Sequence, residues 1–167
     1  MIAETGPPRL GAWDRRQREL PGMAKRNEHQ EAEAMREDVP STIARSGDKA
    51  VRTYKKALES AEDSYGDGER AHRTAFSALK HTHEKVGDHW EPKEEAGPSD
   101  PQAERSSPDS RDGERPTAQG VDANASKKHL VEVARKVGIE RPERSTKKEL
   151  VDAIMRANAR ATERARW

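Results

Sequence analysis

Apolar residues at helical spacing occur in two stretches of this sequence, and the stretch between them is rich in proline. In the first, residues 48–85, apolar side chains follow one another by three or four residues, which places them on one side of an α-helix. The pattern is interrupted at Gly66-Asp67-Gly68 and resumes near Glu69. We therefore expect a helical hairpin whose second helix ends at Gly87, with Trp90 folding back as a lid. The expected core residues are Tyr54, Leu58, Tyr65, Phe76, Leu79 and Trp90.

The second patterned stretch begins at Ser126, a good helix N-cap, and its first helix is expected to end at Gly138. Pro142 cannot continue a helix, so residues 139–144 are expected to be extended. Thr146 and Glu149 have the spacing of a capping box and predict a second helix. The result is a helix-extended-helix module. Beyond residue 158 the Ala/Arg run predicts a helical extension or a frayed tail.

The composition is too polar for one large core. Only 31% of the 167 residues are hydrophobic, 4% are aromatic, and the mean hydropathy is -1.21. We therefore predict an all-α protein of two small helical modules joined by a disordered linker. Residues 1–37 are expected to be a disordered or helix-prone extension, residues 38–90 the hairpin module, residues 91–125 a disordered acidic linker, and residues 126–167 the helix-extended-helix module with a basic tail. Pro21-Gly22 breaks the pattern just before Met23, which raises the alternative that the native chain starts there.

Several classes of protein are not expected from this sequence. There is no cysteine, which excludes disulfides and cysteine-ligated zinc, and no uninterrupted apolar run exceeds three residues, which argues against a transmembrane helix. We expect a cytoplasmic protein without a cofactor. There is no phosphate-binding glycine loop and no nucleophile motif, so we expect no enzyme and no catalytic residues.

The histidines invite a metal hypothesis, because His72, His81, His83 and His89 fall close together. On a helix, His81 and His83 would project from nearly opposite sides, and His72 and His83 would lie about 16 Å apart along the axis. No pair has the spacing of four that suits one ion. We therefore expect no metal site, with His72 and His83 packing in or beside the hairpin.

Charge is distributed unevenly along the chain. Residues 91–125 carry 4 basic and 9 acidic side chains, a net charge of -5, whereas residues 126–167 carry 12 basic and 6 acidic side chains, a net charge of +6. Cations near helix N-termini attract phosphate, so we predict nucleic-acid binding by the last module. The alternative is that these cations serve solubility only. The candidate residues are Lys127, Lys128, Arg135, Lys136, Arg141, Arg144, Lys147 and Lys148.

Residues 38–90 resemble the ChaB family of small bacterial proteins. The resemblance lies in the Val39-Pro40 step, in the first helix with Ala50, Tyr54, Ala57 and Ala61, and above all in residues 71–80 with Trp90 beyond them. The sequence departs from the family at Ser46-Gly47, where a second Leu-Pro step would be expected. The resemblance implies an accessory role, since the family is named for a proposed regulation of cation transport.

Residues 126–157 resemble the helical N-terminal domain of transcription termination factor Rho, which is itself similar to the DNA-binding SAP motif. The matching residues are Leu130, Ala134, Gly138-Ile139, the run from Thr146 to Leu150, and Ile154. In Rho the main RNA contacts belong to a β-barrel domain that follows. The resemblance therefore implies weak binding to DNA or RNA without sequence preference.

Together these observations predict a non-enzymatic bacterial accessory protein, cytoplasmic or associated with the nucleoid, that acts in transcription regulation or termination. The last module would bind nucleic acid through phosphates, and residues 38–90 would bind an unidentified protein. The alternative is a regulator of a membrane cation transporter that acts by protein contact. Self-association is a further expectation, because the hairpin core is small. The choice between DNA and RNA stays open.

Overall fold

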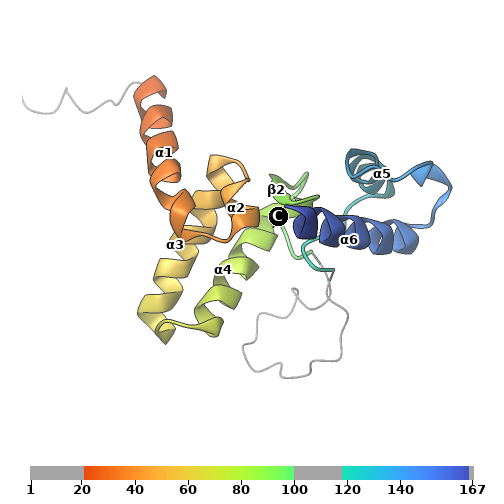
Figure 1. Cartoon of the computed structure of the whole chain (residues 1–167). Helices are drawn as coiled ribbons and strands as arrows, with labels where there is room; N and C mark the ends of the chain where they lie inside the picture. Colours follow the sequence, from red (N-terminus) through yellow and green to blue (C-terminus); the bar gives the residue numbers. More distant parts are fainter. Residues whose placement is uncertain (1–20, 100–117, 166–167) are drawn as a thin grey trace, which may run out of the picture.

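The computed structural model describes residues 21–99 and 118–165, in two helical units on either side of a small β-hairpin (Figure 1). None of the helices in these two ranges is long and apolar enough to cross a membrane. The prediction of a mostly helical chain is confirmed, whereas the β-hairpin was not predicted. The N-terminal unit consists of α1 (Pro21–Met35), η1 (Arg36–Asp38), α2 (Ser41–Ala44), α3 (Asp48–Tyr65) and α4 (Glu69–Thr82). The hairpin is formed by β1 (His83–Val86) and β2 (His89–Pro92), and the C-terminal unit by α5 (Lys127–Lys136), η2 (Pro142–Arg144) and α6 (Lys147–Arg164).

The predicted helical hairpin is confirmed in α3 and α4. Small residues on α4, Ala71 and Ala75, are fully buried and let this helix lie close against α3. Tyr54 packs edge-on against Phe76, with the ring centroids 4.9 Å apart. Tyr65, however, is 51% exposed, so its expected place in the core is wrong. It lies in the last turn of α3, where the guanidinium carbon of Arg70 lies 4.1 Å from the centroid of its ring.

The helix α1 falls where the sequence predicted only a disordered or helix-prone extension. Ala32 is completely buried and Met35 packs against the same core, which places α1 on α3. Residues 1–20, also expected to be disordered, lie outside the described residues. The apolar face of α1 is short, and for that reason the sequence pattern did not predict that this helix packs.

The chain leaves the helical pattern at His83, four residues before the predicted end of α4. The strands pair antiparallel, with Val86 opposite His89, and Gly87 supplies the positive φ of 66° that the two-residue turn needs. Because side chains alternate across a strand, Trp90 enters the core of the N-terminal unit while Val86 enters that of the C-terminal unit. The hairpin therefore belongs to both cores, and Trp90 covers the helices as predicted.

The C-terminal unit has the predicted helix-extended-helix order. Leu130, Val133 and Ala134 of α5 are buried against Leu150 and Ile154 of α6. Pro142 starts a single 3-10 turn within the connection, which the sequence predicted to be extended throughout. The helix α6 continues to Arg164, so the Ala/Arg run is a helical extension.

Both ends of the predicted linker differ from the expectation of disorder. Ser99 is fully buried and its hydroxyl donates to Lys80 O at 3.0 Å, while Ala123 N donates to Ser99 O at 2.9 Å. On the other side, Lys85 N donates to Gly120 O at 2.7 Å. Residues 93–99 and 118–125 thus pack beside the β-hairpin, and residues 100–117 lie outside the described residues.

The two units contact each other directly, although the segment between them was expected to be a disordered linker. Asn158 of α6 is 3% exposed, accepts a hydrogen bond from Gly87 N and donates one to Lys85 O, both at 2.7 Å. His129 of α5 bonds through Nε2 to the buried carboxylate of Glu84. These contacts join residues that lie 45 to 73 positions apart in the sequence. The spacing of apolar residues holds no information about them.

Candidate nucleic-acid interface

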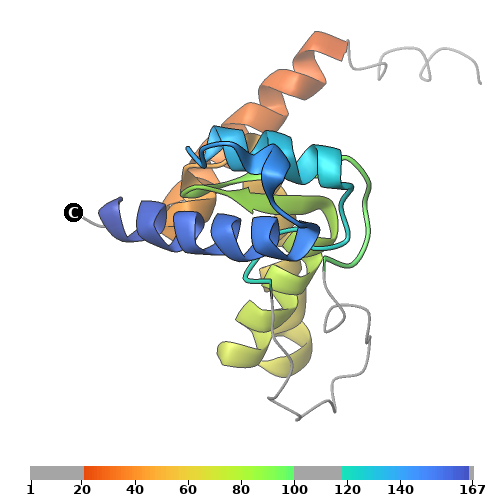
Figure 2. The same ribbon diagram turned by 90° about the vertical axis from the view of Figure 1, so that its right-hand side faces the viewer.

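The helices α5 and α6 begin at the same end of the C-terminal unit, as Figure 2 shows. Ser126 caps α5 by accepting a hydrogen bond from His129 N at 3.1 Å. Thr146 and Glu149 form the predicted capping box at the start of α6, in which Thr146 N donates to Glu149 Oε2 at 2.7 Å. The remaining amides of both first turns carry the positive ends of two helix dipoles. This end of the unit therefore favours anions.

Four exposed lysines surround these two helix starts. Lys147 Nζ donates to Asn124 O, 3.3 Å away and just before α5, so the first turn of α6 lies beside the start of α5. Lys127 lies near enough to Glu149 to help lower the pKa of that carboxyl, after the larger effect of the hydrogen bonds from Thr146. We name this group the lysine patch. It consists of Lys127, Lys128, Lys147 and Lys148.

Two other predicted residues, at the opposite end of α5, are engaged by acidic side chains. Arg135 forms an ion pair with Glu143 of η2. Lys136 Nζ lies 2.6 Å from Glu91 Oε2 of β2, and that hydrogen bond raises the pKa of Lys136. Both cations are thus partly neutralised, and Lys136 fastens the C-terminal unit to the hairpin.

The last two predicted residues lie in the connection between α5 and α6. Arg141 adopts a left-handed conformation with φ 51°, and both Arg141 and Arg144 are exposed. Within the described ranges, neither side chain forms a hydrogen bond or an ion pair. The structure therefore assembles four of the eight predicted cations into one patch and places the other four elsewhere. Binding by any of them stays a prediction.

Sequence reasoning missed three arginines on α6. Arg156, Arg160 and Arg164 are exposed and follow one another by four residues, so they form one row along the helix. The signal was the spacing of four residues, but the sequence left open whether this run is a helical extension or a frayed tail, and a frayed tail has no fixed face. Because α6 is helical to Arg164, the row has a defined direction.

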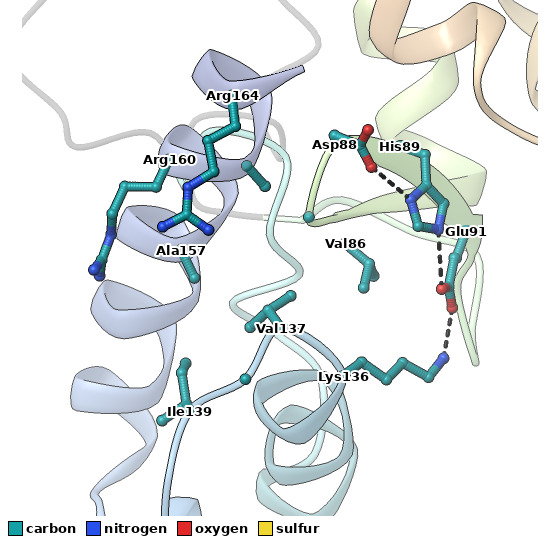
Figure 3. A pocket seen from close by; sticks show the side chains of 13 residues that line it. Val86, Asp88, His89, Glu91, Lys136, Val137, Ile139, Ala157, Arg160 and Arg164 are labelled. Atoms are coloured by element: carbon teal, nitrogen blue, oxygen red, sulfur yellow. Dashed lines mark hydrogen bonds and ion pairs between the residues drawn. The ribbon is translucent and has the colours of Figure 1, made fainter.

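A groove separates the hairpin from the C-terminal halves of α5 and α6 (Figure 3). Its volume is about 830 Å³. The carboxylates of its hairpin wall have cationic partners, since Asp88 pairs with Arg45 at 2.9 Å and Glu91 with Lys136. His89 lies between the two carboxylates. Across the groove, apolar and basic side chains come from the C-terminal unit: Val137, Ile139, Ala157, Arg160 and Arg164.

The interface between the units buries a carboxylate. Glu84 is 2% exposed, and while Oε1 bonds to His129, Oε2 has no hydrogen-bond partner among the described residues. Burial raises the pKa of Glu84 above its usual value of 4.5, against the opposing effect of the hydrogen bond from His129. The carboxyl group of Glu84 therefore binds a proton more tightly in the folded state than in the unfolded state.

That pKa predicts a dependence of stability on pH. A carboxyl with a raised folded pKa stabilises the fold below its unfolded pKa, and this contribution is lost as the pH rises through the folded pKa. Relative to Glu84→Gln, the free energy of unfolding of the native protein is expected to fall as the pH is raised from 4.5. Urea titration of both proteins across this range measures the difference. A difference that is constant with pH would contradict the prediction.

The histidines singled out in the sequence do not share one site. His72 Nδ1 bonds to the hydroxyl of Tyr54 at 2.9 Å, His83 is buried in β1 rather than placed on a helix, and His81 is exposed. A different cluster on the N-terminal unit brings ligand-type atoms within 4.8 Å of one another, and it consists of His29, Glu33 and Asp48.

This cluster already contains a cation. Arg36 bonds to Glu33 and to Asp48, each at 2.7 Å, and His29 Nδ1 lies 2.7 Å from Asp48 Oδ2. The guanidinium supplies the positive charge that the two carboxylates require. We therefore assign the cluster to an ion-pair network that fastens α1 and η1 to the start of α3.

Comparisons with protein families divide the chain at the same place as the fold. Residues 39–93 match the ChaB family, and residues 126–163 match the Rho termination factor N-terminal domain. No curated protein and no solved structure matches the chain. Both resemblances stated from the sequence are thereby confirmed. The protein carries a ChaB domain at residues 39–93 and a Rho termination factor N-terminal domain at residues 126–163.

Proposed function

We propose that this protein is a non-enzymatic bacterial accessory factor that binds DNA or RNA through its Rho N-terminal domain, while its ChaB domain binds another protein. The observation that carries the proposal is the lysine patch, where four exposed cations surround two capped helix N-termini. Amides and ammonium groups so arranged suit phosphate oxygens. The family name, which includes a termination factor, supports a role in transcription regulation or termination.

Contacts of this kind hold the protein on the sugar-phosphate backbone of the nucleic acid and do not distinguish one base from another. Lysines act on phosphates as point charges, and no aromatic residue lies between positions 91 and 166 to stack on bases. We therefore propose weak, sequence-nonspecific binding that is sensitive to salt. The protein would act in the cytoplasm, at the nucleoid if its ligand is DNA.

Charge reversal of the lysine patch tests this proposal. The change of Lys127, Lys128, Lys147 and Lys148 to Glu removes about four phosphate contacts. Four such contacts contribute about 3 to 4 to the salt slope, which is the fall of the logarithm of the binding constant with the logarithm of the salt concentration. We expect binding of the full chain to short DNA and RNA to be lost in a mobility shift assay. All four residues are exposed, so circular dichroism should show an unchanged fold.

A variant with the same change of charge on the N-terminal unit is the control. Lys25, Arg26, Lys49 and Lys80 belong to α1, α3 and α4, and their change to Glu is expected to leave most of the binding intact. The proposal fails if the native chain binds no nucleic acid or if its binding is independent of salt. It also fails if the two variants lose binding equally.

The second candidate function is regulation of a membrane cation transporter by protein contact, and it rests on the match of residues 39–93 to the ChaB family. A pull-down with the full chain, with and without nuclease, separates the two functions. Nucleic acid and nucleoid proteins that disappear after nuclease treatment support the first. A membrane transporter retained after nuclease treatment supports the second.

A further inference from the structure

The arginine row on α6 leads from the lysine patch toward the groove between the two domains. Arg156 and Arg164 are eight residues apart, which is about 12 Å along a helix. Arg156 Nε donates to Asp152 O at 3.1 Å and Arg160 Nε to Arg156 O at 3.2 Å, so both side chains lie back along α6. Within the described ranges, none of the three arginines forms an ion pair with a carboxylate.

The groove at the end of this row is uneven in charge. On the hairpin side, Asp88 and Glu91 already have cationic partners, whereas Arg160 and Arg164 on α6 have no carboxylate partner among the described residues. Figure 3 shows the guanidinium of Arg160 on the side of α6 that faces away from the hairpin. Between the two sides lie apolar residues, among them Val137 and Ile139. The volume of about 830 Å³ is within the range of small-molecule sites. A ligand with an anionic group next to a flat apolar one fits this arrangement.

We propose that single-stranded nucleic acid lies along α6, with its phosphates on Arg156, Arg160 and Arg164 and one unpaired base in the groove between the domains. The inference rests on the proposed function, because it continues the path of a strand bound at the lysine patch. A base in a duplex is paired and stacked and cannot reach the groove floor, whereas an unpaired base can turn out of the strand. Arginine also forms two parallel hydrogen bonds to one phosphate.

This arrangement gives the ChaB domain a part in binding. One wall of the groove is the hairpin, and its carboxylates would repel phosphate without Arg45 and Lys136. Docking of the two domains therefore forms the groove and supplies Lys136 as the partner of Glu91, while Asp88 is paired by Arg45 of the ChaB domain itself. Neither domain alone contains the complete site.

The test compares strands by fluorescence anisotropy, with the full chain. The probes are labelled oligothymidylate and oligouridylate of about 15 nucleotides, and a mixed-sequence duplex of equal length. We expect both single strands to bind more tightly than the duplex. In the variant with Arg156, Arg160 and Arg164 changed to Gln, we expect the salt slope on single strands to fall by about 2 and the affinity by at least about tenfold.

The control removes three cations from the N-terminal unit by changing Lys25, Arg26 and Lys49 to Gln. It is expected to bind like the native chain. The inference is overturned if the arginine variant binds single strands as tightly as this control does. That result would leave the groove to an acidic peptide. The inference is also overturned if the duplex binds as tightly as the single strands. In both cases the proposed function stands as long as charge reversal of the lysine patch abolishes binding.

Discussion

Replacing Trp90 with alanine is expected to destabilise the ChaB domain by about 3 to 5 kcal/mol, the range measured for large aromatic residues cut back in a core. Trp90 is 4% exposed, and its ring lies 6.3 Å from that of Phe76. The ring also contacts the segment that enters the second domain, because a Cβ on Gly120 would lie only 2.7 Å from Trp90 Cη2. The substitution therefore leaves a cavity next to both domains.

Urea denaturation followed by circular dichroism measures this loss. The matched control is Tyr65→Ala, which removes the 51% exposed aromatic of the same domain and is expected to cost less than about 1 kcal/mol. A small domain has roughly 5 to 15 kcal/mol of stability in total, so this loss is a large part of it. We therefore expect the Trp90 variant to unfold at a much lower urea concentration than the native protein, and the Tyr65 variant to unfold close to the native midpoint. Equal costs for the two substitutions would contradict the assignment of Trp90 as a core residue.

Replacing Asn158 with alanine is expected to separate the two domains without unfolding either one. The amide of Asn158 satisfies Gly87 N and Lys85 O of the hairpin, and both bonds are 2.7 Å long. Without it, two backbone groups at the interface lose their partners, at about 1 to 3 kcal/mol each. The hairpin should then exchange its amide hydrogens faster.

Hydrogen exchange followed by mass spectrometry reports this change peptide by peptide. We expect faster exchange over residues 83–92 and little change within α3. Thr162→Ala is the control, because the hydroxyl of Thr162 donates only to Asn158 O within α6. Unchanged protection of the hairpin in the Asn158 variant would show that this side chain does not hold the domains together.

Domain docking also limits which cations remain for nucleic acid. Lys136 was a candidate for phosphate binding, yet its ammonium lies against Glu91 of the hairpin. The lysine patch is at the other end of α5 and is independent of that contact. The same docking brings Arg160 and Arg164 opposite the hairpin, where the groove forms. The interface between the domains thus pairs one of the eight candidate cations with a carboxylate and forms the groove.

The sequence alone determined the local parts of this protein. The helices α3, α4, α5 and α6 follow from apolar residues three and four positions apart, and the starts of α5 and α6 follow from Ser126 and Thr146. These signals are readable because a helix and its cap involve residues that are neighbours in the chain. The two family resemblances rest on the same local patterns.

Only the tertiary structure decided how these parts meet. The β-hairpin forms where residues 83–92 lie between two cores, and its buried side chains have no helical period. Asn158 and Glu84 became interface residues through partners 71 and 45 positions away, which no local pattern encodes. The gathering of the lysine patch likewise depends on α5 and α6 starting side by side. Charge identified the residues, and packing between distant segments determined which of them lie together.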